Sequence, residues 1–421
     1  MKKILAFALT LVMIFALACP SAFAAKDGSV YWLNFKPELD ETAQALAAKY
    51  TQETGVPVKV ITAASGSYNQ TLNNEMGKSG APTLFVIGNT DGVKEWGDFA
   101  MDLTGTPIAE ERSTDAYTLY DETGKMVSIG YCYECYGIVV NPANVEKAGH
   151  SMDELVNFEG LKAVAEDIHA NAATLGFDAF ASADMDSSSS WRFTGHMANL
   201  EYFYEKKADG WTGMPAALTG AYMENFKNLY DLMINNSISD PKDLATGGHD
   251  AANEFKSGKV TFYFTGSWDY ADLAAAVPDV TMIPYYCGVE GEEKAGLNCG
   301  TENCWAINAD ASEEDKQATM DFLIWMVNDP EAAGVLVNNL GILPFKHVPE
   351  STNGFLADAA KYTDAGGYVM DWVSQPNVDA YRAALVSALN QYDADQTDAN
   401  WELVKAAFVD GWAVQYAAGQ E

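Results

Sequence analysis

Two kinds of hydrophobic pattern alternate along the first part of the chain. Apolar side chains recur at helical spacing over residues 39–55, and the run closes at Gly55, which predicts a helix. The sequence then predicts a strand over 56–61, a helix over 70–78 and a strand over 83–87. Strands that alternate with helices predict parallel βαβ units, and strands this short are expected to be buried on both faces.

The loops after these two strands carry polar side chains. Ser67 and Tyr68 lie in the loop after the first strand, and Asn89 lies in the loop after the second. In open α/β sheets ligands bind beyond the carboxyl ends of the strands, so all three residues are candidate contacts. Simple turn formation is the alternative explanation for the same residues.

A later strand ends in an unusual combination of residues. The apolar run 262–264 breaks at Gly266, and Trp268 and Asp269 follow where a turn leads into a helix. This order repeats that of the first two strands, which makes Trp268 a candidate ligand contact. The alternative is an indole that only closes the end of its strand against the next helix.

The second half of the chain is richer in helical patterns. Leu161, Val164 and Ile168 share one helical face, which predicts a helix packed on the core. Near the C-terminus four large side chains recur at helical spacing and are expected to be core residues: Trp401, Val404, Phe408 and Trp412. The chain contains no internal repeat and no long linker.

Length and charge narrow the class of protein. A chain of 421 residues is longer than one hydrophobic core usually serves, so two lobes are expected. With 59 acidic and 25 basic residues the net charge is −34. Such a surface repels phosphate backbones and anionic lipid, so we expect no nucleic-acid partner and a ligand that is neutral or cationic.

The N-terminus has the pattern of a removed export signal over residues 1–24. Lys2 and Lys3 precede an apolar stretch over 4–18, and small residues precede the expected cleavage after Ala24. Cys19 leaves lipid anchoring as the less favoured alternative, because a lipoprotein signal also places a cysteine after the apolar stretch. The mature protein is therefore expected to work outside the cytoplasm.

No short motif for catalysis or cofactor binding occurs in the chain. GxGxxG, the P-loop, GxSxG and HExxH are all absent, so we expect no enzyme activity, no cofactor and no metal. Carboxylates suited to a glycosidase are abundant, but so many acids make any one pair uninformative.

Five cysteines follow the predicted signal. Cys132 and Cys135 resemble a redox or zinc motif, but they fall in a predicted strand, where positions three apart face opposite sides. Together with Cys299 and Cys304 they would make a four-thiolate metal site, which is a weaker alternative. Cys287 and Cys299 flank a hairpin-like connection, so the preferred disulfide joins these two. Free buried thiols are the remaining alternative.

Several segments together resemble the family 1 extracellular solute-binding proteins, the sugar receptors of ABC importers, and in particular maltodextrin-binding proteins. The segments occur in the family's order and cover most of the mature chain: 27–32, 50–60, 81–85, 137–142, 262–269 and 300–308. The resemblance implies an α/β fold of two lobes, with a hinge of crossing strands and a ligand cleft between the lobes. It also implies a monomeric receptor whose partner is the membrane permease.

The resemblance also implies where the chain divides. The N-terminal lobe would comprise residues 25–134 and 304–345. The C-terminal lobe would comprise residues 135–303 and 346–421. The crossings would lie near Glu134 and Cys135, at residues 301–303, and after residues 341–345.

By the same resemblance Trp268 is a stacking platform for a sugar, because indoles stack on the C–H faces of sugars while carboxylates such as Asp269 accept hydrogen bonds from hydroxyls. Glu134 matches the hinge-strand acid that holds sugar hydroxyls, or is a solvated hinge acid. Further candidate contacts, each with a structural alternative, are Trp191, Arg192, Trp372, Glu302 and Asn303.

The sequence thus predicts an exported binding protein that captures a sugar or oligosaccharide and delivers it to a permease. The alternatives are a receptor for another polar solute, such as an amino acid or a polyamine-like cation, and a secreted carbohydrate-active enzyme. The sugar's identity, length and linkage are not encoded in any motif we recognise.

Overall fold

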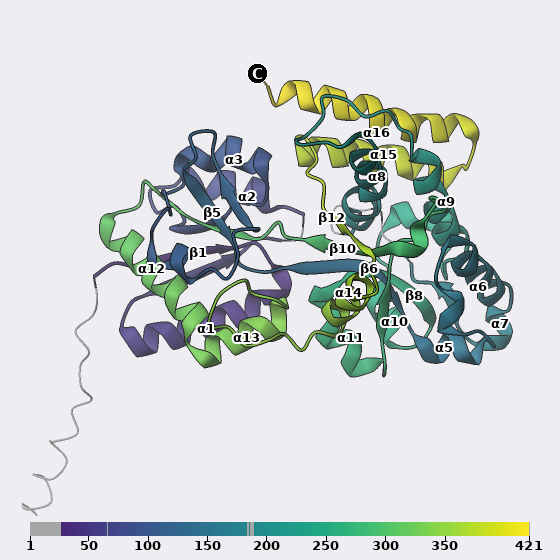
Figure 1. Cartoon of the computed structure of the whole chain (residues 1–421), viewed down its shortest axis with the longest axis horizontal. Coiled ribbons are helices and arrows are strands. Elements are labelled where there is room, and N and C mark those ends of the chain that lie inside the picture. Colours follow the sequence, from purple (N-terminus) through teal and green to yellow (C-terminus); the bar gives the residue numbers. More distant parts are fainter. Residues whose placement is uncertain (1–26, 65, 183–184, 186–188, 421) are drawn as a thin grey trace, which may run out of the picture.

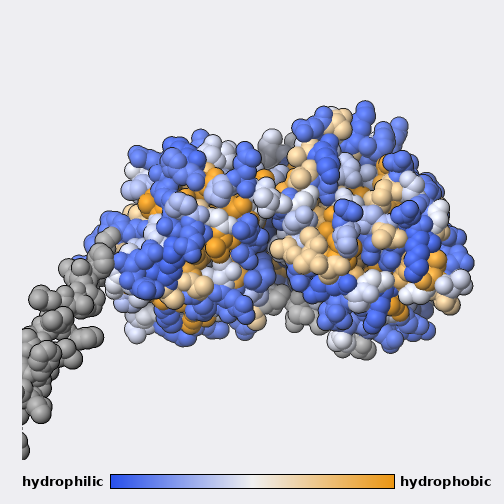
Figure 2. Space-filling view, turned by 90° about the horizontal axis from the view of Figure 1, so that it is seen from below, coloured by the Kyte–Doolittle hydropathy of each residue, from blue (hydrophilic) through white to orange (hydrophobic). Residues whose placement is uncertain are grey.

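Two separate β-sheets divide the computed structural model into two lobes that lie side by side (Figure 1). The structure describes residues 27–64, 66–182, 185 and 189–420. The expected export signal at 1–24 and Cys19 lie outside the described residues. In the described part no helix is long and apolar enough to cross a bilayer. Figure 2 shows two rounded masses with a largely hydrophilic surface, joined across a narrower waist.

The first lobe is built on a six-stranded sheet in the order β2-β1-β3-β11-β5-β4. Its strands are β1 (Val30–Asn34), β2 (Val58–Thr62), β3 (Leu84–Val86), β4 (Thr118–Tyr120), β5 (Met126–Gly130) and β11 (Cys304–Ile307). Its helices are α1 (Asp40–Thr54), α2 (Tyr68–Met76), α3 (Thr90–Trp96), α4 (Pro107–Glu111), α12 (Glu313–Asn328) and α13 (Pro330–Leu340), with the short turns η1 (Pro37–Leu39) and η2 (Gly97–Phe99). Strands β2, β1 and β3 are parallel, as the βαβ pattern predicts.

The second lobe is built on the strand order β12-β10-β6-β8-β7, with β9 paired to β6. Its strands are β6 (Glu134–Val140), β7 (Asp178–Phe180), β8 (Val260–Gly266), β9 (Thr281–Ile283), β10 (Ala295–Gly300) and β12 (Tyr368–Asp371). Its helices are α5 (Pro142–Lys147), α6 (Phe158–Ala170), α7 (Ala172–Leu175), α8 (Asn199–Asp209), α9 (Met223–Asn235), α10 (Ala251–Lys256), α11 (Tyr270–Ala276), α14 (Gly354–Asp364), α15 (Val378–Ala394) and α16 (Asp398–Ala418). Shorter turns are η3 (Met152–Glu154), η5 (Pro241–Thr246), η6 (Ser267–Asp269) and η7 (Glu292–Lys294), and η4 (Arg192–Met197) is a π-helix.

The chain passes between the two lobes at three places (Figure 1). It leaves the first sheet at the end of β5 and enters the second at β6, and it returns between β10 and β11. The third passage runs from α13, which packs in the core of the first lobe, to α14, which packs on the second. The first two passages lie next to each other, because β6 pairs with β10 and β5 pairs with β11.

Most elements expected from the pattern form where the sequence predicts them. Helix α1 ends at Gly55, whose φ of 77° is the left-handed conformation that suits glycine at a helix end. The side chains at helical spacing in α6 and α16 are buried in the core of the second lobe. The expectation for β2 is wrong: this strand is half-exposed because it forms the edge of its sheet, whereas β3 is buried throughout.

The disulfide expected between Cys287 and Cys299 is also wrong. The five described cysteines are free and buried. Cys287 is not on a hairpin strand, because its backbone N–H donates to the Glu292 carboxylate and its carbonyl accepts from Asn225 and Asn228 on α9. Cys299 lies on β10 in a different apolar cluster.

The two cysteines of the C-x-x-C motif pack in different cores, but not because both lie on one strand as expected: Cys132 lies in the passage before β6, and only Cys135 is on the strand. Cys132 packs in the first lobe and Cys135 in a cluster of the second. Within the described ranges no group of three or more His, Cys, Asp or Glu side chains could hold a metal ion.

A buried carboxyl in the second lobe couples stability to pH. Tyr230 donates a 2.7 Å hydrogen bond to Oδ1 of Asp393, whose Oδ2 has no partner among the described residues. Burial raises the pKa of Asp393 from 3.8 to about 7. The folded protein therefore holds this proton more tightly than the unfolded chain does, so stability falls as pH rises from about 4 to about 7.

Replacing Asp393 with asparagine is expected to remove this part of the pH dependence. As the pH rises from 4 to 8, the native chain should lose about 2–4 kcal/mol of unfolding free energy that the variant keeps. The reason is that an asparagine does not ionise, whereas the buried carboxyl must either hold its proton or become charged. Urea unfolding of both proteins at the two pH values measures the difference. A difference that is the same at both pH values contradicts the assignment.

Candidate functional site: an aromatic and charged cleft between the lobes

Trp268 follows the end of β8 and folds back over it. A Cβ added at Gly266 would lie 2.2 Å from Cη2 of Trp268, so only glycine leaves room for the indole here. Trp268 is half-buried, in contrast to the fully buried side chains of the strand before it. The spacing of glycine and tryptophan therefore positions an indole at the strand end with part of its surface accessible.

Four other aromatic rings form one cluster with Trp268. His196 stacks on Tyr136 of β6 with ring centroids 3.9 Å apart, and it lies 5.4 Å from Trp268. Trp191 lies 4.8 Å from His196 and 5.8 Å from Trp268. Trp372 stacks on Tyr136 at 5.3 Å. The structure thus brings together the three tryptophans predicted from the sequence, and Tyr136 and His196 connect them.

His196 is an uncharged member of this cluster. Burial, together with the positive charges of Arg382, Arg192 and Lys36, holds the pKa of His196 well below its ordinary value. Within the described ranges, Nδ1 of His196 and Nε1 of Trp372 are buried and lack a hydrogen-bond partner. Two polar ring atoms of this aromatic cluster are therefore buried without a hydrogen bond from the described residues.

Trp372 follows β12 and lies against a second glycine. A Cβ at Gly300 would come 2.8 Å from Cδ2 of Trp372. This tryptophan also lines a cavity of about 310 Å³ at the passage between the lobes. Residues of both lobes line the cavity, including Tyr117 from the first, Asp371 from the second, and Tyr133 from the crossing segment.

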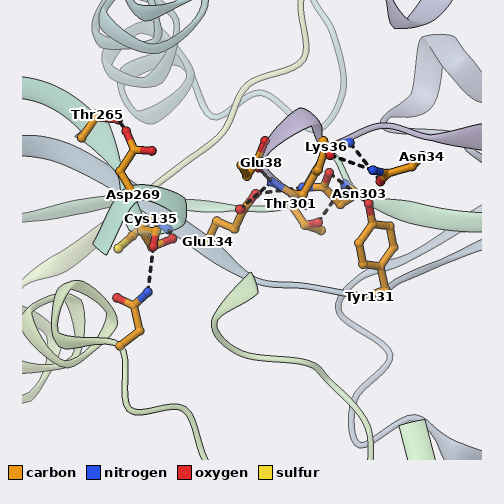
Figure 3. Close-up of polar contacts among 12 residues, drawn as sticks. Asn34, Lys36, Glu38, Tyr131, Glu134, Cys135, Thr265, Asp269, Thr301 and Asn303 are labelled. Atoms are coloured by element: carbon orange, nitrogen blue, oxygen red, sulfur yellow. Dashed lines mark hydrogen bonds and ion pairs between the residues drawn. The ribbon is translucent and has the colours of Figure 1, made fainter. Parts of the chain in front are cut away.

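A charged network, buried except for Glu38, centres on Glu134 (Figure 3). Lys36, just after β1, donates a 2.7 Å bond from Nζ to Oε1 of Glu134, the first residue of β6. Nδ2 of Asn303 donates a 2.8 Å bond to Oε2 of the same carboxylate. Glu38 accepts a further 3.1 Å bond from Lys36. Lys36 from the first lobe and Asn303 from the second passage thus converge on Glu134 of the first passage.

The position of Lys36 is fixed by its own loop. Asn34, the last residue of β1, donates from Nδ2 to the Lys36 carbonyl at 2.7 Å and accepts from the Lys36 N–H at 3.1 Å. The ammonium of Lys36 then lies 5.7 Å from the ring centroid of Trp268. A cation of one lobe therefore faces the indole of the other, which is a cation–π geometry.

Burial and charge act against each other in the network. Burial lowers the pKa of Lys36, but the carboxylates of Glu134 and Glu38 outweigh this and hold it above the ordinary value. Burial raises the pKa of Glu134, and Lys36 acts in the opposite direction. The ammonium is thus retained at neutral pH, next to an acceptor and an amide that can bind hydroxyl groups.

Arg192 and Asp269 lie next to the cluster but face their own lobe. Arg192 donates from Nε to the Phe264 carbonyl at 3.0 Å and from Nη2 to the Tyr263 hydroxyl at 2.8 Å. Its guanidinium also lies 4.2 Å from the ring centroid of Trp191. Asp269 accepts a 2.6 Å bond from Thr265, and burial raises the pKa of Asp269. Arg192 therefore packs against the indole of Trp191. Asp269 closes the turn between β8 and α11.

The three candidates from the strand-end loops of the first lobe make local contacts. Ser67 donates to the Ala64 carbonyl at 2.8 Å, and the Asn89 side chain accepts from the Gly92 N–H at the start of α3. The Tyr68 hydroxyl accepts from the Val86 N–H at 2.7 Å. The structure places these residues in turn, capping and core roles.

Glu302 belongs to the second passage but not to the charged network. Its side chain is half-buried, and its carbonyl lies so close to Gly88 that a Cβ there would approach it to 2.7 Å. Of the two candidates at this passage, only Asn303 bonds to Glu134.

Sequence reasoning missed three members of the site: Lys36, Tyr136 and His196. Lys36 follows a buried strand, the same position that singled out Ser67 and Asn89, so that rule could have found it. Tyr136 lies two residues after Glu134 and therefore on the same face of β6. His196 is five residues after Trp191, and the π-helix that brings them together has no sequence signature we know.

Two α/β lobes, three chain passages, and a cavity beside an aromatic and charged cluster at these passages define a two-lobed solute-binding protein. The chain belongs to the bacterial extracellular solute-binding protein family, whose model matches residues 45–348. A search of curated protein sequences finds no match. The family and the structural neighbours are solute-binding receptors, not enzymes.

Solved structures share the fold at low sequence identity. RafE in complex with raffinose has a TM-score of 0.69 at 17% identity, over 90% of this chain and 98% of that chain. A chitin oligosaccharide binding protein has a TM-score of 0.69 at 17% identity, over 93% and 99%. MalE from Bdellovibrio bacteriovorus bound to maltotriose has a TM-score of 0.64 at 16% identity, over 90% and 98%.

Proposed function

We propose that this protein is the extracytoplasmic receptor of an ABC importer, and that it binds a sugar or oligosaccharide between its lobes and delivers it to the membrane permease. The observation that carries the proposal is the meeting of Trp268 with Lys36 and Glu134. An indole face beside a charged donor and a charged acceptor suits a ligand with C–H faces and hydroxyl edges. The solved neighbours named for raffinose, chitin oligosaccharide and maltotriose support this ligand class.

The proposed contacts come from both lobes and from the passages between them. Trp191, Trp268 and Trp372 would supply stacking surfaces, while Glu134, Lys36 and Asn303 would bind hydroxyls. Residues 25–134 with 304–345, and 135–303 with 346–421, would move as two bodies and close over the ligand, as periplasmic receptors do. Arg192, Asp269, Ser67, Tyr68, Asn89 and Glu302 would position the cleft.

The electrostatics of the cleft favour a sugar over a cationic solute. The ammonium of Lys36 already faces Trp268 at 5.7 Å, where an amine ligand would otherwise form its cation–π contact. A second cation there would meet the repulsion of Lys36. A neutral ligand can accept from the ammonium and donate to Glu134 without adding a charge.

The proposal includes export to the site of binding. The expected signal over residues 1–24 would be removed after Ala24, and lipid attachment at Cys19 is the alternative. The acidic surface would keep the mature, monomeric protein soluble at high concentration.

A thermal-shift screen against neutral tri- and oligosaccharides, with amino acids and polyamines as the comparison set, tests the proposal. A ligand that binds only the folded state raises the unfolding free energy by RT ln(1 + [L]/Kd), and the melting temperature rises with it. We expect at least one oligosaccharide to raise the melting temperature and to be recovered uncleaved. Stabilisation by amines alone, or cleavage of the sugar, would refute a sugar receptor.

A further inference from the structure

Two of the hinge cysteines lie directly opposite each other. Cys135 on β6 pairs with Cys299 on β10 in an antiparallel ladder, between the neighbouring pairs Tyr136–Asn298 and Glu134–Gly300. Opposed residues in such a ladder project to the same face of the sheet. Both thiols are buried in one apolar cluster, under Phe355 and Leu356 of α14. The pair therefore joins the two strands that lead into adjacent passages between the lobes.

The backbone identifies which kind of ladder position this is. The Cys135 N–H donates to Oγ of Ser267, and its carbonyl faces Gly266, where an added Cβ would lie 2.7 Å from it. Both polar groups of Cys135 thus point toward β8 and away from β10. Cys135 and Cys299 form a non-hydrogen-bonded pair, in which opposed Cα atoms are about 4.5 Å apart. A disulfide requires Cα atoms about 4.4–6.8 Å apart.

We propose that Cys135 and Cys299, which are free thiols in this structure, form a disulfide in the exported protein and cross-link the two crossing strands. The two thiols lose two protons and two electrons, and a disulfide oxidant, such as oxidised glutathione or a thiol oxidoreductase, accepts the electrons and becomes two thiols. The family is extracellular, which is the compartment where protein disulfides persist. No other pair of described cysteines is opposed in a ladder.

The neighbouring cysteines lack this geometry. Cys304 on β11 lies opposite Gly130, two residues before Cys132, so these two thiols could meet only diagonally. Diagonal positions in an antiparallel pair are about 7–8 Å apart, beyond the span of a disulfide. Cys287 is in another cluster of the second lobe.

Burial determines when the bond forms. Desolvation raises the pKa of Cys299 to about 11 and the pKa of Cys135 well above its ordinary value, so thiolate is scarce once the protein has folded. Thiol–disulfide exchange needs thiolate. The cross-link therefore forms while the strands pair during folding, and the folded protein then protects it from reductants.

Peptide mapping tests the linkage. The chain is refolded in a mixture of oxidised and reduced glutathione, unfolded without reductant in iodoacetamide, and cut with a glutamate-specific protease. Glu134 lies between Cys132 and Cys135, and Glu302 lies between Cys299 and Cys304, so the cuts separate the candidate pairs. We expect one linked pair of peptides, carrying Cys135 and Cys299. Alkylation of both residues, or linkage of either to another cysteine, overturns the proposal.

Serine variants give an independent readout. The Cys135→Ser and Cys299→Ser variants should lose the link, whereas the matched controls Cys132→Ser, Cys304→Ser and Cys287→Ser should keep it. Because the bond closes a long loop of the unfolded chain, the oxidised native protein should melt about 5 °C above the same protein reduced before refolding. An equal melting temperature would overturn the stabilising role of the bond.

Discussion

Replacing Trp268 with alanine is expected to lower sugar affinity roughly thirty- to a thousand-fold and to leave the fold intact. Loss of an aromatic anchor at a binding site typically costs about 2–4 kcal/mol of binding free energy. Trp268 is half-buried and lies at a strand end rather than in the centre of a core, so truncation removes mainly a surface for the ligand. Calorimetry with the sugar found by thermal shift measures the affinity, and melting without ligand measures the stability.

Trp401 provides the matched control for this prediction. It is 4% exposed and packs in the core between α16 and its neighbours, far in sequence from any candidate contact. The Trp401→Ala variant should lose about 3–5 kcal/mol of stability and keep the native affinity in its folded fraction. A Trp268→Ala variant that melts early and binds normally would show that the indole merely closes the end of β8.

Replacing Glu134 with alanine is expected to lower the unfolding free energy by about 3 kcal/mol, because it leaves the buried ammonium of Lys36 with only Glu38 as its partner. The side chains of Lys36 and Glu134 are 6% and 2% exposed, so water screens their interaction little. Urea unfolding measures the loss. Sugar affinity should fall as well, since Glu134 is a proposed acceptor for hydroxyl groups.

Two further variants separate pairing from general damage. Glu402→Ala breaks an exposed ion pair with Lys405 and should change stability by no measurable amount. Adding Lys36→Met to Glu134→Ala removes the stranded charge, so the double variant should be more stable than Glu134→Ala alone. If the double variant is the less stable of the two, the charge of Lys36 is not what destabilises the single variant.

Local features of the sequence predicted the fold well. The alternation of strand and helix over residues 39–87 specified the parallel part of the first sheet, and the glycine closing α1 lies where its pattern ends. The partial exposure of β2 was not predictable from these residues, because it arises from the position of β2 at the edge of the sheet. Edge position is a property of the assembled sheet, not of the segment.

The candidate site was predicted only in part, because some of its contacts join residues that are distant in the chain. Strand-end loops pointed to Trp268, and resemblance added Glu134, Trp191 and Trp372. The partner of Glu134 lies 98 residues away in the chain, and no local pattern pairs Lys36 with it. The cysteines show the same limit: the preferred pairing used closeness in sequence, whereas the register of β6 and β10 sets Cys135 opposite Cys299.

Two of the tryptophans lie against glycines, and substitutions at these glycines could change which ligand the receptor prefers. Gly266 and Gly300 carry no side chain, and each allows an indole to lie against the backbone. Adding one methyl group at either glycine would push the indole of Trp268 or Trp372 away from the backbone. The shape of the aromatic cluster would change although every aromatic residue stayed the same. If the indoles stack on the ligand as proposed, ligand preference can drift through these two glycines, and comparing only the proposed contact residues would overlook the cause.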